Sequence, residues 1–332
     1  MLAFFKKSSP GCIFAITIIL CLLWIPAFMF PRSGAEHIYN AYPMPLYELV
    51  MNILGSNYFI NTLFAILLMI ANLVLISFGN SNEFFFDQKS FLPALFYIII
   101  NSAYPGNQIM NPVIVATLFL NFALIRIMNS YKQPVVCSHF FDAGIIIGVG
   151  SLFYANLIWF GILIFIGMAV FRSFEIREFI SAIIGIFTPF GLTMAIYYLT
   201  DKDLSSLSSN FVANLFMDEG LPFMSISSII VYLIIGIILV LSIINLVGRV
   251  NTKKIKVRKT FTMLMWTLVI SVILFVLSPA VSLDIVWLMA LPCCFFLGHF
   301  FVYAKKAKLA EVLFDVLLLS VFLVQLIRVV RF

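Results

Sequence analysis

Charged side chains are scarce in this sequence. Asp, Glu, Lys and Arg make up 10% of its 332 residues, against about 25% in a typical soluble domain. Hydrophobic residues make up 63%, and the mean hydropathy is +1.13. This composition excludes an ordinary soluble domain, whereas it suits helices that face lipid and satisfy their backbone polar groups internally. We therefore expect an all-α, polytopic membrane helical bundle, with residues 1–332 forming a single integral membrane domain.

Cysteine and histidine are too few and too scattered to indicate a redox or metal site. No C-x-x-C spacing joins any of the five cysteines, and no two of the three histidines lie four residues apart. The sequence also lacks a Rossmann fingerprint and a P-loop. We predict no cofactor, although this pattern leaves a divalent metal open, and we expect no nucleic-acid partner.

Apolar runs follow one another along the chain. A spanning helix needs about 20 mostly apolar residues, and by that criterion we predict about eleven spans, with ten and twelve as alternatives. They are Gly11–Phe30, Tyr58–Phe78, Phe91–Tyr104, Asn111–Met128, His139–Phe153, Asn156–Phe171, Phe179–Leu199, Ser225–Val247, Phe261–Ser278, Ile285–Ala304 and Ala310–Ile327. The third is short, rising only about 21 Å, and it ends at the breaker Pro105-Gly106. It is therefore tilted, extended beyond its apolar limits, or re-entrant.

Basic residues indicate the orientation, because Lys and Arg gather in cytoplasmic loops. With a cytoplasmic N-terminus, strict alternation of the spans leaves 16 of the 20 basic residues inside and only Arg32, Lys202, Arg328 and Arg331 outside. The cytoplasmic loop 248–260 carries six basic residues and no acid. Topology alone explains this loop, and a regulatory lipid or an acidic partner is the alternative.

Two outside loops, residues 31–57 and 200–223, are longer than simple connectors. Each contains an apolar stripe with the spacing of an amphipathic helix. The stripes consist of Leu46, Leu49, Val50 and Ile53 in the first loop and of Phe211, Val212, Leu215 and Phe216 in the second. Helices of this kind lie on the membrane surface, so we expect two outside amphipathic helices that can roof a cavity.

Seven acids fall on the outer side of this topology. They are Glu36, Glu48, Asp201, Asp203, Asp218, Glu219 and Asp284. A carboxylate beside a lipid-linked phosphate ester can act as a general base, and simple solvation is the alternative for each acid. Glu36 is the first catalytic candidate, because Arg32 and His37 lie close to it in the sequence. Glu48 is the second candidate.

The outside arginines are candidates for binding a lipid phosphate, because a guanidinium holds phosphate with two parallel hydrogen bonds. Arg32, Arg328 and Arg331 are the residues concerned. The alternative for Arg328 and Arg331 is structural, since both close the last span, where a cation complements the helix dipole and reaches the headgroups.

Two acids lie inside predicted spans, where ionisable groups are costly and usually functional. Asp142 stands near the cytoplasmic start of the fifth span, and Asp315 lies about 7–8 Å along the last span from Ala310. We expect both to be buried polar groups, and Asp315 to need a partner. The alternative is stabilisation by the dipole at the helix N-terminus.

Several segments resemble a domain-of-unknown-function family of bacterial inner-membrane proteins. They are Phe91-Leu92-Pro93-Ala94-Leu95-Phe96-Tyr97, Phe141-Asp142-Ala143-Gly144, Ser151-Leu152-Phe153-Tyr154, Phe171-Arg172, and Ile176-Arg177-Glu178-Phe179 with Gly185 and Pro189. That family is similar in layout to polytopic glycosyltransferases of the GT-C type. Such enzymes take sugars from polyprenyl-phosphate donors on the outer face, using an acid in or near the first outside loop. The resemblance thus implies residence in the bacterial inner membrane and a role for Glu36 or Glu48.

These observations give one leading hypothesis and two alternatives. In the leading one, Glu36 deprotonates an acceptor hydroxyl while Arg32 or another outside cation neutralises the leaving lipid phosphate of a polyprenyl-linked sugar. The first alternative is a non-enzymatic membrane subunit of an envelope or secretion assembly, with other membrane proteins as partners. The second is a lipid or solute transporter, which requires a deep cavity that opens alternately to both sides.

Overall fold

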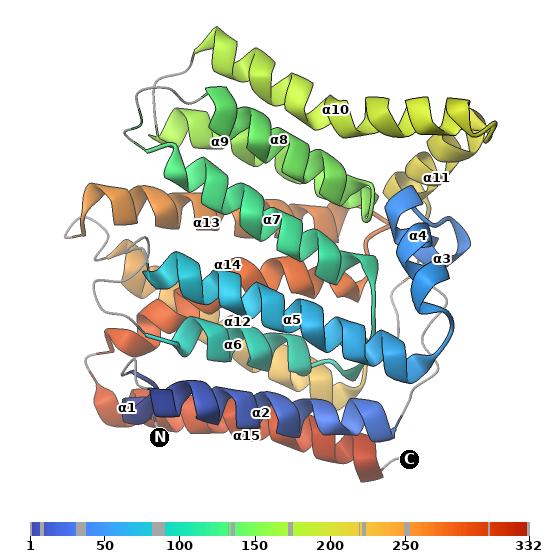
Figure 1. Ribbon diagram of the computed structural model, residues 1–332. Coiled ribbons are helices and arrows are strands. Elements are labelled where there is room, and N and C mark those ends of the chain that lie inside the picture. Colours follow the sequence, from blue (N-terminus) through green and yellow to red (C-terminus); the bar gives the residue numbers. More distant parts are fainter. Residues whose placement is uncertain are drawn as a thin grey trace.

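Most of the chain that the computed structural model describes is helical, and there is no strand in that part (Figure 1). The described residues are 2–6, 10–30, 38–81, 90–131, 133, 137–171, 175–218, 220, 224–248, 253–304 and 306–330. The α-helices are α1 (Leu2–Phe5), α2 (Pro10–Met29), α3 (Ile38–Ala41), α4 (Pro45–Leu54), α5 (Tyr58–Ser81), α6 (Leu92–Ser102), α7 (Pro112–Asn129), α8 (Cys137–Ser151), α9 (Ile162–Phe171), α10 (Ile176–Leu199), α11 (Leu204–Phe216), α12 (Ile226–Val247), α13 (Ile255–Leu277), α14 (Val286–Val302) and α15 (Ala307–Val330). The 3-10 helices are η1 (Pro105–Asn107), η2 (Ala155–Gly161) and η4 (Leu283–Ile285).

Eight helices within the described ranges are long and apolar enough to cross a membrane. They are α2, α5, α7, α10, α12, α13, η4 with α14, and α15. The other three predicted spans form shorter apolar helices, namely α6, α8, and η2 with α9. The prediction of an all-α, polytopic membrane bundle is confirmed, while the count of about eleven spans stays a prediction.

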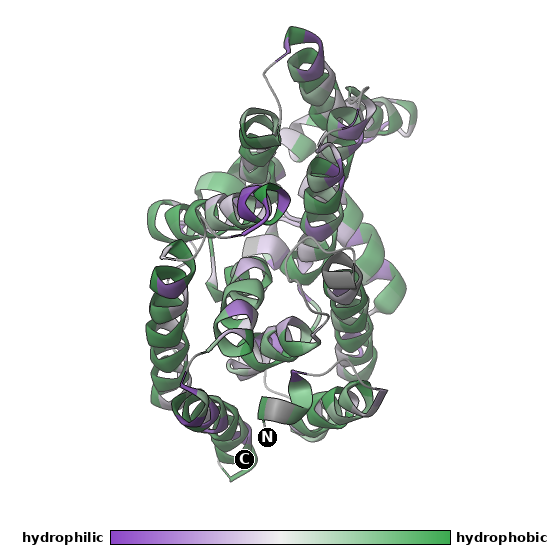
Figure 2. Cartoon of the chain, turned by 90° about the vertical axis from the view of Figure 1, so that its left-hand side faces the viewer, coloured by the Kyte–Doolittle hydropathy of each residue, from purple (hydrophilic) through white to green (hydrophobic). Residues whose placement is uncertain are grey.

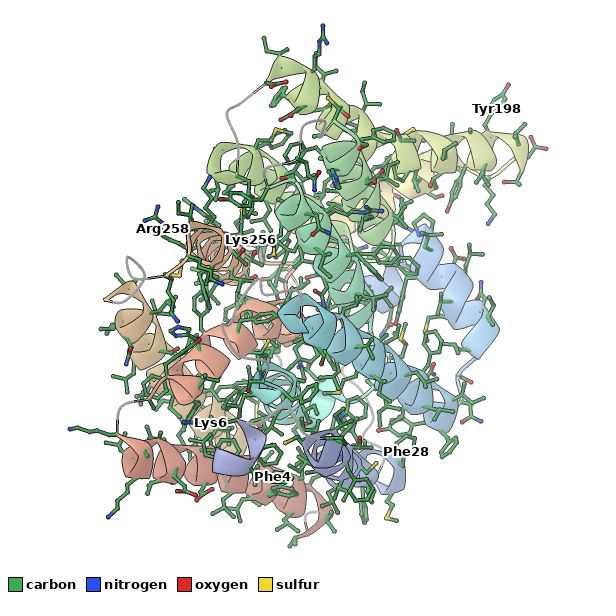
Figure 3. The ribbon with its side chains drawn as sticks, turned by 60° about the vertical axis from the view of Figure 1, so that its left-hand side comes forward. Phe4, Lys6, Phe28, Tyr198, Lys256 and Arg258 are labelled. Carbon is green, nitrogen blue, oxygen red and sulfur yellow. The ribbon has the colours of Figure 1, made fainter. Side chains whose placement is uncertain are left out.

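The spanning helices lie alongside one another, and their connections alternate between two ends (Figure 1). We call one end the capped end, because α3, α4 and α11 lie there, where α2 and α15 finish and α14 begins. We call the other the basic end. Figure 3 shows Lys256 and Arg258, from the first turn of α13, on the side opposite to Tyr198 near the end of α10.

Lysines at the basic end lie over aromatic rings. The ammonium of Lys253 sits 3.8 Å from the centroid of Tyr303, and that of Lys259 sits 5.4 Å from the centroid of Tyr131. Such contacts hold cations close to the protein surface. These contacts hold Lys253, before α13, and Lys259, within α13, against the protein, since residues 255–260 of the predicted loop belong to that helix.

Helices α6 and α14 form the centre of the bundle. All residues of α6 are buried, and 78% of the window covering η4 and α14 is buried, compared with 22% for α10 and 28% for α12. Phe96 of α6 stacks on Phe301 of α14 with ring centroids 5.0 Å apart. Seen along the helices (Figure 2), hydrophobic residues dominate the ribbons of the outer helices too, as expected for surfaces that face lipid.

Close backbone packing joins α8 to α10. A Cβ placed on Gly185 of α10 would lie 2.5 Å from the carbonyl oxygen of Phe141, and one on Gly148 of α8 would meet that of Ile186 equally closely, at 2.5 Å. Ser181 adds a hydrogen bond of 3.0 Å to the carbonyl oxygen of Cys137. Small residues let membrane helices approach in this way, because lipid offers no hydrophobic drive for their association.

The short third span ends in an irregular, mostly buried connection. Helix α6 has 11 residues, too few to cross a bilayer alone, and η1 lies in the connection between it and α7. Asn111 caps α7 by accepting a hydrogen bond of 2.9 Å from the backbone of Ile114. Non-helical backbone inside a membrane protein occurs where protein or a polar cavity surrounds it, and here the surrounding helices bury most of the connection.

Candidate functional site at the capped end

The first amphipathic helix, α4, packs on a face offset by one residue from the predicted stripe. Tyr47 is buried, and Val50, Met51 and Leu54 pack against the core. The predicted stripe residue Ile53 is instead 84% exposed, and Leu49 is also exposed. Both faces of α4 are apolar, so spacing alone did not identify the one that meets the protein.

The second amphipathic helix, α11, is bonded to the chain around α3 and α4. The Asn210 amide donates to the carbonyl oxygen of Pro43 at 3.0 Å, and the Asn214 amide donates to that of Tyr42 at 2.6 Å. The Asn156 amide in turn donates to the carbonyl oxygen of Asn214 at 2.8 Å. Residues 38–54 and 204–216 therefore form one connected layer, which we call the cover.

A buried carboxylate lies beneath the cover. Asp284 in η4, directly before α14, is only 3% exposed. The Tyr39 hydroxyl of α3 donates to Asp284 Oδ2 at 2.8 Å, and Ser282 Oγ donates to the same oxygen at 3.3 Å. A hydroxyl donor and a position at a helix N-terminus both stabilise a buried anion. Asp284 thus ties the cover to the central helix.

Tyrosines surround this carboxylate. The ring of Tyr47 lies 5.8 Å from that of Tyr39, nearly perpendicular to it at 87°. Burial, and secondarily the negative charge of Asp284, raises the pKa of Tyr47 above its ordinary value. Tyr47 therefore keeps its hydroxyl proton to a higher pH than an exposed tyrosine does.

A buried guanidinium lies at the same end of the bundle. Arg328 near the end of α15 is 1% exposed. It donates to Gln108 Oε1 at 2.7 Å, to the carbonyl oxygen of Phe30 at 2.9 Å, and to the Tyr58 hydroxyl at 3.4 Å. The Gln108 amide also donates to the carbonyl oxygen of Leu23 at 2.9 Å. Arg328 therefore points inward and joins α15 to α2, η1 and α5, and does not reach outward to the headgroups.

An apolar groove of about 330 Å³ runs between the cover and the second half of α10. Its lining is Met44, Leu152, Ile158, Phe187, Phe190, Met194, Leu204, Leu207, Ser208, Phe211 and Val212. Helix α10 contains Pro189 and changes direction midway along its length (Figure 1), as proline inside a helix causes. Met44, the N-cap of α4, belongs to the cover and lines the groove.

Three of the predicted site residues, Arg32, Glu36 and Arg331, lie outside the described residues. The described chain on each side of Arg32 and Glu36 is anchored at the capped end, because Phe30 accepts from Arg328 and Tyr39 donates to Asp284. The catalytic role of Glu36 and the phosphate-binding roles of all three outside arginines stay predictions.

The remaining predicted residues, Glu48, Asp142 and Asp315, are exposed or half-buried. Glu48 is exposed in the first turn of α4. Asp142 was expected to be buried, but its side chain is 38% exposed and forms a 3.7 Å ion pair with Arg126. Asp315 is half-buried, and its Oδ1 atom is buried with no hydrogen-bond partner among the described residues.

Nothing in the sequence distinguishes Asp284 from the other outside acids, and Gln108 was not among the predicted site residues. The sequence feature that points to Gln108 is the polar stretch from Asn101 to Asn111, which interrupts the apolar runs around Pro105-Gly106. In the described part of the chain, no three His, Cys, Asp or Glu side chains gather closely enough to hold a metal ion.

Comparison with known proteins gives a family without an assigned activity. No curated protein and no solved structure matches the chain. One family model, described as a family of unknown function (DUF6427), matches residues 41–332, which include the cover, Asp284 and Arg328. The expected membership in a domain-of-unknown-function family is confirmed, and the GT-C-like layout stays a prediction. The chain belongs to the DUF6427 family.

Proposed function

We propose that this protein is a membrane glycosyltransferase that handles a polyprenyl-phosphate-linked sugar at the capped end. The observation that carries the proposal is the pair of buried charged groups at that end, Asp284 beneath the cover and Arg328 beside η1. Buried charges in a membrane protein are costly and usually serve a function. A substrate with a hydrocarbon chain, a phosphate and a sugar needs apolar and charged contacts close together.

The groove beside the cover supports the same substrate. Its lining is almost entirely apolar, and it borders α10, whose surface is mostly exposed to lipid. A polyprenyl chain can enter such a groove sideways from the bilayer. Met44 would then bring the head of that lipid toward Tyr47 and Asp284.

In this proposal the reaction occurs on the outer side of the bacterial inner membrane, with the N-terminus in the cytoplasm. The described basic residues in loop 248–260 support this orientation, because they lie at the end opposite to the cover. Glu36 takes the proton of the acceptor hydroxyl, and Arg32 or another outside cation such as Arg328 neutralises the leaving phosphate.

The proposal is tested by sugar transfer with the purified full chain in nanodiscs. The donors are labelled polyprenyl-phosphate sugars, and the acceptors are outer-envelope glycans. We expect turnover by the wild type and a loss of about 100-fold or more in Glu36→Gln, as for a removed general base. The matched control is Asp201→Asn. Asp201 is an exposed acid at the capped end, and its backbone has a positive φ angle that Asn tolerates. Full activity in Glu36→Gln contradicts the proposed role of Glu36. If partner proteins co-purify with the chain in a fixed ratio and no lipid phosphate is bound, the result favours the alternative of a non-enzymatic assembly subunit.

A further inference from the structure

A second apolar groove, of about 440 Å³, lies between α12 and α13 on the outside of the bundle. Two of the residues that line it, Val247 and Trp266, are 62% and 44% exposed, and only 28% of α12 is buried. The walls also include Leu246 of α12, Phe261, Met265 and Val269 of α13, and Phe296 of α14. Because these surfaces face the bilayer, a lipid chain reaches the groove sideways without passing through the interior of the protein.

The length of this groove matches one leaflet of a bilayer. Along α13, its lining extends from Arg258 to Val269, a rise of about 16 Å. The hydrocarbon core of a bilayer is about 30 Å thick, so one leaflet contributes about 15 Å. An extended acyl chain that starts beside Arg258 therefore fits along the groove.

A cation lies where the groove reaches the basic end. Arg258 lines the groove, and Figure 3 shows it at that end together with Lys256. The Arg258 side chain is exposed, and no acid pairs with it in the described part of the chain. Residues 253–259 contain five basic residues and no acid. The groove thus joins an apolar channel for a chain to positive charge for a headgroup.

The distribution of basic residues across the membrane explains the charge of this segment, but it does not explain the groove. Lys253 and Lys259 lie over the rings of Tyr303 and Tyr131, so both ammonium groups are held against the protein. Arg258 is the cation that borders the groove. Basic pockets between membrane helices typically bind anionic lipid headgroups, and a guanidinium binds phosphate with two parallel hydrogen bonds.

The charge of residues 253–259 selects the kind of headgroup. Every phospholipid has a phosphate that Arg258 can bind. A zwitterionic headgroup also brings its own cation next to this basic segment, and like charges repel. A headgroup with net negative charge avoids that repulsion. A soluble phosphate lacks the hydrocarbon chain that fills the groove.

We infer that the groove between α12 and α13 binds an anionic phospholipid from the leaflet at the basic end. Its phosphate lies on Arg258, and one acyl chain runs along Phe261, Met265 and Val269. This inference does not rest on the proposed function, because the groove reaches the end opposite to the cover. It holds whether or not the capped end transfers sugars.

Quenching of Trp266 fluorescence by brominated lipids tests the inference in the full chain. Trp266 lines the groove about 12 Å along α13 from Arg258, so bromines in the middle of an acyl chain come close to it. Trp24 and Trp287 are 0% exposed, and Trp159→Phe removes the fourth tryptophan, which is 39% exposed. This variant serves as the parent protein for all measurements.

The parent protein is placed in nanodiscs of phosphatidylcholine. A minor fraction of the lipid is brominated, and it is either phosphatidylglycerol or phosphatidylcholine with the same chains. We expect brominated phosphatidylglycerol to quench Trp266 about fivefold more strongly at equal fraction, the preference that about one cation near a membrane surface provides.

Arg258→Gln should remove most of this preference while quenching by brominated phosphatidylcholine stays the same. Arg258 is exposed, so its replacement does not disturb the packing of the bundle. Arg258→Lys should keep part of the preference, because it retains the charge and loses the paired hydrogen bonds. The matched control is Arg177→Gln. Arg177 is an exposed cation in the first turn of α10 that does not line the groove, so this variant should behave like the parent.

Three results would overturn the inference. Equal quenching of the parent protein by the two lipids means that the groove does not select negative charge, and the basic segment is then left for an acidic protein partner. A preference that survives Arg258→Gln places the phosphate elsewhere. An equal loss of preference in Arg177→Gln indicates a diffuse attraction of anionic lipid to the whole basic end and no defined site.

Discussion

Replacing Tyr39 by Phe removes the hydroxyl that ties the cover to the central helix. In the wild type, this hydroxyl donates to Asp284 Oδ2 over 2.8 Å, in a buried environment. The variant keeps the ring and its packing against Tyr47, so the change isolates the hydrogen bond. The carboxylate retains Ser282 as a donor.

The expected size of the effect follows from the charge of the acceptor. A hydrogen bond to a charged group contributes about 1.5–3 kcal/mol to stability. Because Tyr39 belongs to the cover, the loss falls mainly on the local opening of residues 38–54 and much less on the unfolding of the bundle. A loss of about 2 kcal/mol raises the population of the open cover about 30-fold.

Hydrogen exchange with mass spectrometry measures this opening directly. Peptides from α4 should exchange about 30-fold faster in Tyr39→Phe, while peptides from the buried helix α6 keep the wild-type rate. Tyr42→Phe is the matched control, because Tyr42 contributes its backbone oxygen to the cover and its side chain is 37% exposed. We expect no change in that control.

Unchanged exchange of α4 in Tyr39→Phe would refute the reasoning that Asp284 holds the cover closed. Faster exchange spread evenly over all helices would refute it as well, because the bond would then stabilise the whole bundle and not the cover.

Three further variants test the packing and the buried charges. Gly185→Ala should lower the unfolding free energy by about 1–3 kcal/mol, because its Cβ would meet a backbone oxygen at 2.5 Å; Gly191→Ala on the same helix meets nothing within 4 Å and should be neutral or slightly stabilising in thermal melts. Arg328→Gln should cost about 3 kcal/mol or more, since it breaks charged hydrogen bonds and deprives Gln108 of its donor; a melting temperature equal to that of the wild type would contradict this. Stability should fall as pH rises above about 10, since the unfolded chain loses the Tyr47 proton there while the raised pKa keeps it in the folded chain; Tyr47→Phe should flatten that part of the stability profile, and an unchanged slope would contradict this.

The spans were predictable because hydropathy is a local property. Each of the eight long apolar helices coincides with a run recognised from the sequence. The short helix α6 was the uncertain case, and its length is explained by its position at the centre of the bundle, where other helices bury it completely. The number of helices that cross the whole bilayer depends on how deep each helix lies in the membrane. The apolar runs of the sequence do not specify that depth.

The orientation of the surface helix α4 was not predictable from periodicity. The stripe through Leu49 and Ile53 and the face through Tyr47 and Met51 are both apolar. Lipid and protein accept the same side chains, so the spacing fits either face. In the described structure, Tyr47 turns toward the buried carboxylate, and Ile53 turns away from the protein.

The partners of the buried charges depend on contacts between distant parts of the chain. Tyr39 and Asp284 are separated by 245 positions, and Arg328 and Gln108 by 220. A single sequence contains no local pattern that joins such pairs. Asp284 therefore looked like any other outside acid, and Arg328 looked like a cation that closes the last helix.

Photocrosslinking with a lipid-linked sugar tests most directly whether the substrate is handled at the capped end. A polyprenyl-phosphate hexose with a diazirine on the sugar is added to the full chain in nanodiscs, and the crosslinked peptides are mapped by mass spectrometry. The account predicts crosslinks in residues 38–54 and 283–287, competed away by the unlabelled lipid. Competed crosslinks concentrated in residues 253–259 at the basic end, with none at the cover, would contradict it.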